Sequence, residues 1–241
     1  MMLLYENSFD GFLSAVFEAF RIGRGASLQN SDELEGETIF ETLRVARDLK
    51  KVDRVSAGMA RLDFDLERKA YFAWLSRIRG IDDDILESLR LGFEHGLDPL
   101  TMLYEDAPKR VFGAFHKVGH EAERGRQFVR FKKAGAGIYV ADLSPVYDIL
   151  PLIGTHFHER FACQRFIIRD LLRRRAIVSD ESGWHITALP YGDIPLPEDG
   201  EFEALWRRYF DVIAIKEREN PALQRKFVPL GYRKHLTEFN T

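Results

Sequence analysis

The stretch RQFVRFKKAGAGIYVADL (residues 126–143) decides the expected fold, because apolar and polar residues alternate on both sides of a glycine-rich centre. A period of two predicts β-strands, and the glycines predict a turn that joins them into a hairpin. In such a hairpin Val129 and Phe131 face the core, whereas Phe128, Arg130 and Lys132 share the opposite face. The segments RRRAIVSD and WHITAL, separated by ESG, predict a second hairpin.

The rest of the chain is dominated by helical patterns. A short strand is expected at 2–6, followed by a helix that Ser8 caps and by a polar loop at 26–36. Further helices are expected at 39–49, 53–79, 82–95, 108–122, 155–170 (with Thr155 as the N-cap) and 201–218.

The sequence therefore predicts an α+β protein. Helices pack a mostly antiparallel sheet formed by residues 126–190, with strand 2–6 as a candidate extra member, and the N-terminal and central region is helical. We expect an acidic, mainly helical region at 1–122 with an N-terminal strand. A basic α+β region at 123–241 follows, with two hairpins and a C-terminal helix; one continuous domain is the alternative.

Charge is distributed unevenly along the chain. Residues 1–106 contain 13 Lys/Arg and 21 Asp/Glu, whereas residues 107–241 contain 22 and 17. A basic half on a chain of net charge −3 indicates a local anionic partner, or else only a solvated face. The apolar runs are short and no signal peptide is evident, so we expect no membrane association and a cytoplasmic location.

The stretch GTHFHERFACQRFIIRD (154–170) contains two histidines and Cys163, the only cysteine of the chain. In a helix, His156 and His158 diverge by about 200°, which argues against a shared metal. Cys163 is expected to be a buried apolar residue rather than a nucleophile. His156 and Arg160, four residues apart, share a face that fits an anion, although structural capping is the alternative.

Between Arg124 and Lys133, basic residues are interleaved with Phe128 and Phe131. This pattern is typical of nucleic-acid-binding surfaces. Solubilisation of edge strands is the alternative explanation. No phosphate loop or dinucleotide motif is present, so no cofactor and no metal are predicted. The candidate nucleic-acid or anion-binding residues are Arg124, Phe128, Arg130, Lys132, His156, Arg160 and Arg173.

Several segments, in the same order along nearly the whole chain, carry a family resemblance. They include SFDGFLSAVFEAF, VDRVSAGM, LRLGFEHG, FVRF, IYVADLSPVYDILPLIGTHFHERF, NPALQRKFVP and LTEF. The chain resembles a bacterial family of unknown function described as DNA-metabolism or DNA-repair proteins. The resemblance implies a radical-SAM protein as partner, in DNA modification or repair; some members are fused to a uracil-DNA-glycosylase-like domain. It implies a pathway and a partner, but no mechanism.

Three functional hypotheses follow. The leading one is a non-catalytic accessory protein that binds DNA or helps a radical-SAM partner to bind it. The second is a small nucleic-acid-processing hydrolase that uses His156, Glu121 or Glu123, and Asp170. The third is an interaction scaffold in which the helix at 201–218 docks a partner. Asp170 and Arg173 are expected to form a structural ion pair.

Overall fold

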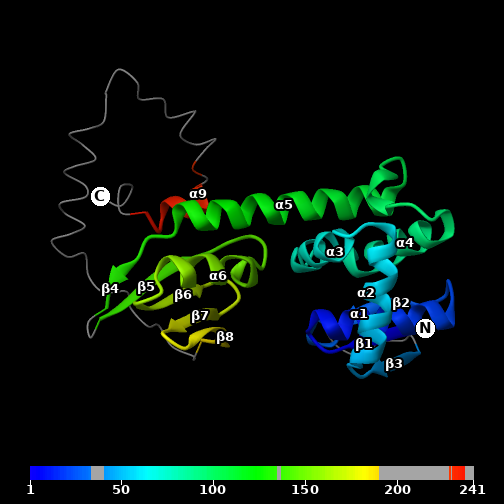
Figure 1. Ribbon diagram of the computed structural model, residues 1–241, viewed down its shortest axis with the longest axis horizontal. Helices are drawn as coiled ribbons and strands as arrows, with labels where there is room; N and C mark the ends of the chain where they lie inside the picture. The colour runs from blue at the N-terminus through cyan, green and yellow to red at the C-terminus, as the bar shows by residue number, and fades with distance from the viewer. Residues whose placement is uncertain (34–40, 135–136, 190–227, 229, 237–241) are drawn as a thin grey trace, which may run out of the picture. The chain divides into compact units, whose positions relative to one another are not determined.

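The computed structural model describes residues 1–33, 41–134, 137–189, 228 and 230–236 (Figure 1). The chain divides into two compact units, Met1–Gly119 and His120–Thr241. The sequence placed the boundary three residues later, after residue 122. Both positions fall within one helix, α5 (Asp106–Phe128).

The first unit contains a three-stranded sheet in the order β2-β1-β3, made of β1 (Met2–Tyr5), β2 (Ser27–Asn30) and β3 (Thr42–Val45). Both pairings are parallel. Helix α1 (Phe9–Ile22) connects β1 to β2 and packs on the sheet. As predicted, the Ser8 side chain caps α1, accepting a hydrogen bond from the Gly11 amide at 3.0 Å.

Three expectations for this unit were wrong. Strand β2 lies in the expected polar loop, and β3 lies within the expected helix 39–49. Strand β1 belongs to its own sheet and does not extend the sheet of residues 126–190.

Helices complete the first unit. They are α2 (Leu49–Leu62), α3 (Leu66–Leu75), α4 (Ile81–His95) and the N-terminal part of α5, with short 3-10 turns at Ser31–Glu33 and Pro99–Thr101. The single helix expected at 53–79 is therefore two helices, which separate at Asp63. The core contains fully buried side chains such as Phe12, Leu13 and Met59.

The second unit contains a five-stranded sheet in the order β4-β5-β6-β7-β8. Its strands are β4 (Lys132–Lys133), β5 (Ile138–Leu143), β6 (Arg165–Asp170), β7 (Arg175–Asp180) and β8 (Gly183–Ala188). Strands β5 and β6 are parallel and the other pairs antiparallel. The α+β class is thus confirmed, but the sheets are not mostly antiparallel, because one is parallel and the other is mixed.

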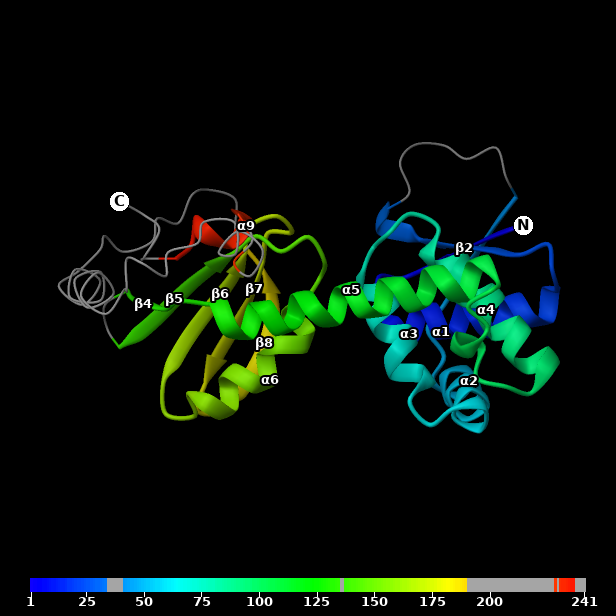
Figure 2. The ribbon, with the colours of Figure 1, turned by 90° about the horizontal axis from the view of Figure 1, so that it is seen from above.

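The parallel pair β5-β6 requires a crossover connection, which α6 (Leu150–Arg160) supplies. Figure 2 shows α6 and the C-terminal end of α5 beside the sheet. Their apolar side chains share one core with the strands, which includes Ala122, Ile149, Ile153, Phe157 and Phe166. The short helix α9 (Leu230–Arg233) docks through the Tyr232 hydroxyl, which donates to the Glu121 carbonyl at 3.4 Å.

The expected helix 155–170 was wrong in its bounds. Helix α6 begins earlier, at Leu150 with Pro151 in its first turn, and Thr155 lies in its interior instead of capping it. Residues 165–170 form strand β6. Cys163 lies between the two elements and is exposed, so the expected buried position was also wrong.

The first predicted hairpin exists only in part. Helix α5 continues to Phe128, and the strand that pairs with β5 is reduced to the two residues of β4. Phe128 and Arg130 are therefore not on a strand, so the strand predicted there was wrong, but Val129 and Phe131 do contribute to the core as predicted. The second hairpin, β7 with β8, is confirmed.

The helix expected at 201–218 lies outside the described residues. Among the residues that the structure describes, no helix is both long and apolar enough to cross a membrane.

Candidate functional site

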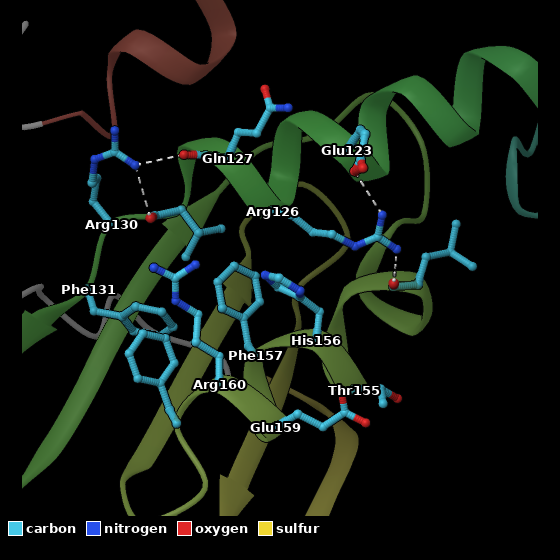
Figure 3. Close-up of a pocket in the computed structure, with 13 residues that line it drawn as sticks. Glu123, Arg126, Gln127, Arg130, Phe131, Thr155, His156, Phe157, Glu159 and Arg160 are labelled. Atoms are coloured by element: carbon cyan, nitrogen blue, oxygen red, sulfur yellow. Dashed lines mark hydrogen bonds and ion pairs between the residues drawn. The ribbon is translucent and has the colours of Figure 1, made fainter.

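A cavity of about 760 Å³ lies in the second unit, between the C-terminal end of α5 and α6 (Figure 3). We call it the α5–α6 pocket. It is lined by Glu123, Arg126, Gln127, Val129, Arg130, Phe131, Leu152, Thr155, His156, Phe157, Glu159, Arg160 and Phe161.

Close packing fixes the two helices that form the pocket. A Cβ atom on Gly125 of α5 would lie 2.8 Å from the Ile149 side chain, and one on Gly154 of α6 would lie 2.5 Å from the Trp184 ring. Both glycines are needed for these approaches. A hydrogen bond of 2.9 Å between His158 Nδ1 and Ser179 Oγ adds a polar link from α6 to β7. Close packing therefore holds α5 against the start of α6, and α6 against the sheet.

Phenylalanine rings form one wall of the pocket. The Phe131 ring meets Phe157 and Phe161 edge-on, with centroids 5.6 and 5.1 Å apart. Phe157 is buried, whereas Phe131 and Phe161 are partly exposed. Such a cluster combines a fixed position with an accessible aromatic surface.

Two arginines of the pocket hold its frame together. Arg126 pairs with Glu123 at 3.0 Å and donates to the Leu152 carbonyl at 2.8 Å, which ties α5 to the start of α6. Arg130 donates to the Gln127 carbonyl at 2.9 Å and so satisfies the end of α5. Part of the hydrogen-bonding capacity of both guanidinium groups is thus used inside the protein.

Arg160 and His156 differ from these two. Both point from α6 towards the end of α5, into the pocket (Figure 3). Within the described part of the chain, neither side chain enters a hydrogen bond or an ion pair; Arg160 lies 5.9 Å from the centroid of the Phe161 ring. The shared face predicted for these two residues from their spacing is present in α6. Both side chains therefore keep hydrogen-bonding groups that no described residue uses.

The charge of the pocket is only slightly positive, since Arg126, Arg130 and Arg160 are balanced in part by Glu123 and Glu159. In Figure 3 the Glu159 carboxylate points away from the Arg160 guanidinium.

The other four candidate binding residues lie outside the pocket. Phe128 packs on Tyr232 of α9, with ring centroids 5.8 Å apart. Burial raises the pKa of the Tyr232 hydroxyl, and the nearby charge of Arg124 opposes that shift. Lys132 pairs with Val140 in the sheet.

Arg173 has a structural role. It pairs with buried Asp170 at 3.0 Å, which confirms the expected ion pair, and donates to the carbonyls of Pro145 and Val146. It therefore holds the loop between β5 and α6.

The residues of the hydrolase hypothesis are only partly assembled. Glu121 is buried and accepts hydrogen bonds from the amides of Val146 and Tyr147, at 2.9 and 2.7 Å. Asp170 is fully buried, and burial raises the pKa of its carboxyl group. Of the four residues, only Glu123 and His156 line the pocket. In the described ranges no group of three or more His, Cys, Asp or Glu side chains is arranged to hold a metal ion.

Arg126, Phe131, Phe157 and Phe161 were not identified as site residues from the sequence. If the helix predicted at 108–122 had been extended to Phe128, where α5 ends, the pattern of pocket residues would have been visible in the sequence. Glu123, Arg126, Gln127 and Arg130 then recur at intervals of three and four residues, which places them on one side of the helix.

The fold and this pocket define an α+β protein with a cationic and aromatic cavity. Residues 79–238 match the family model described as DUF4130, a domain of unknown function, and the chain belongs to this family. The comparison with curated proteins found no match, and neither did the comparison with solved structures.

Proposed function

We propose that this protein is an accessory factor in DNA repair or DNA modification that binds nucleic acid in the α5–α6 pocket and works with a radical-SAM partner. One observation carries the binding proposal. Arg160 and His156 point into an aromatic cavity, and their side chains form no hydrogen bond or ion pair with any described residue.

The chemistry of the pocket suits a nucleotide. A guanidinium group binds phosphate oxygens through paired hydrogen bonds, and Arg160 is exposed enough to do so. Aromatic rings offer a surface to a base without regard to sequence. The pathway and the radical-SAM partner rest on the sequence resemblance, which runs nearly end to end.

The binding proposal is tested by fluorescence anisotropy with labelled DNA over a series of salt concentrations. Arg160→Gln should weaken binding about tenfold, equivalent to ~1.4 kcal/mol. It should also reduce the slope of the logarithm of the binding constant against the logarithm of the salt concentration, by about 0.7–0.9 in magnitude, as expected for the loss of one phosphate contact. Arg61→Gln removes the same charge from an exposed position on α2 and should leave both quantities unchanged.

Equal affinities for wild type and Arg160→Gln would refute the placement of the site, and no binding at any salt concentration would refute the binding proposal. The partner is tested separately, by co-expression with the radical-SAM protein and co-purification. A complex that survives gel filtration is expected; two separate peaks would contradict this part of the proposal.

A further inference from the structure

The α5–α6 pocket has the character of a nucleotide site rather than of a surface that follows a phosphate backbone. The lining of the pocket contains three arginines and two glutamates, and Arg126 is already paired with Glu123. So small a positive excess provides little attraction for a polyanion, because backbone binding needs many neutralised phosphates. If the pocket binds a nucleotide, the partly exposed rings of Phe131 and Phe161 are the other groups that can supply affinity.

We propose that the pocket receives one unstacked nucleotide of a single-stranded segment. Its base lies against Phe161 and Phe131, and its phosphate is bound by Arg160. This inference rests on the proposed function and narrows it to unpaired nucleic acid.

The dimensions of the cavity fit this ligand. A volume of about 760 Å³ falls within the range of about 300–1,000 Å³ typical of small-molecule sites. In a duplex, both faces of each base are covered by neighbouring bases, so only a base that has left the stack has a face free to lie against the rings of the pocket.

The phosphate-binding group and the aromatic ring are neighbours in the pocket. The Arg160 guanidinium carbon lies over the Phe161 ring, 5.9 Å from its centroid, so a nucleotide bound by Arg160 has the rings of the pocket within reach. Buried Phe157 contacts the Phe131 ring edge-on, with ring centroids 5.6 Å apart. The pocket also contains exposed Gln127 and Thr155, whose amide and hydroxyl groups suit the edge of a base.

The experiment compares three ligands on the full-length protein by anisotropy. They are an oligothymidylate of about ten nucleotides, an abasic oligomer with the same number of phosphates, and a duplex of the same length. The single strand should bind best, and the abasic oligomer should bind about 5- to 100-fold more weakly because it lacks the stacking base.

Variants then locate the base. Phe161→Leu should weaken binding of the single strand about 5- to 100-fold, but leave binding of the abasic oligomer unchanged. Phe161→Tyr keeps the ring and should retain the affinity. Phe64→Leu changes an aromatic residue that is 91% exposed in the first unit and should have no effect. If Phe161→Leu does not fold, the abasic comparison still tests for a stacking base, and Phe131→Leu, at the second partly exposed ring of the pocket, tests its position.

Each outcome has a distinct meaning. Equal binding of all three ligands would overturn this inference and leave the proposed function intact. Loss of affinity in the abasic oligomer, without an effect of Phe161→Leu, would overturn the position assigned to the base. Failure of every ligand to bind would overturn the proposed function as well.

Discussion

At the scale of single residues, the clearest energetic consequence comes from Asp82, at the start of α4. The Tyr5 hydroxyl donates to this carboxylate, and the indole nitrogen of Trp74 donates to the Tyr5 oxygen at 3.0 Å. Burial, together with the charges of Glu33 and Asp83, raises the pKa of Asp82 to about 7, although the Tyr5 hydrogen bond and the charge of Arg77 lower it. Removal from water is thus the dominant influence on this carboxyl group.

The pKa of Asp82 predicts a loss of stability as the pH rises from acidic values towards neutrality. The folded-state value of about 7 lies above the reference value of 3.8, so the folded state binds the proton more tightly than the unfolded state. The contribution to the free energy of unfolding is complete below pH 3.8 and is lost as the pH rises to about 7. Urea midpoints should therefore fall between pH 5 and pH 8.5 by less in Asp82→Asn than in wild type.

Asp53→Asn is the matched control, because Asp53 is exposed on α2. It should follow the wild-type pH dependence. If Asp82→Asn loses as much stability as wild type over the same range, the Asp82 carboxyl group is not protonated in the folded protein at pH 5.

At the scale of elements, the helices with strong periodic patterns and the hairpin β7-β8 were predictable from the sequence. Strand β6 was not, because it is paired on both sides in the sheet and four of its six residues are buried. A strand buried on both faces loses the alternation that identifies strands, and the run RFIIRD then fits a helix equally well. Strand β3 has only four residues, three of them exposed, so its pattern carries little information.

The candidate site was predictable where it depends on one helix. The spacing of His156 and Arg160 placed both on one face, and both line the pocket. Arg124 and Phe128 could not be placed, because their neighbour is Tyr232 of α9, about a hundred residues further along the chain. Local patterns do not reveal contacts over such separations.

The contact of α6 with β8 leads to a second prediction. Alanine at Gly154 would bring its Cβ within 2.5 Å of the Trp184 ring, so α6 must shift away from the sheet. We expect Gly154→Ala to lower the free energy of unfolding by about 1–3 kcal/mol.

Gly113 in α5 provides the control for this substitution. A Cβ on Gly113 meets no atom within 4 Å, so Gly113→Ala should stabilise the protein by about 0.5–1 kcal/mol through helix propensity. Chemical denaturation of both variants measures the two effects. A neutral Gly154→Ala would show that α6 does not need this close approach.

At the scale of the whole molecule, the chain consists of two units with separate cores. Phe12 and Leu13 belong to the core of the first, and Phe166 and Ile168 to that of the second. The charge asymmetry follows a similar division, since the acidic excess lies in residues 1–106 and the basic excess in residues 107–241. The candidate site lies entirely within the second unit.

The division into units predicts that damage to one core remains local. Native-state hydrogen exchange reports the opening of individual segments. In Gly154→Ala, amides of β5–β8 should exchange faster, because α6 covers β7 and β8, whereas amides of β1 and α1 should keep their wild-type rates. Val16→Ala, which removes a fully buried side chain of α1, should give the reverse pattern. Faster exchange in both units from either variant would mean that the chain unfolds as one cooperative body, because opening would then no longer follow the boundary at Gly119.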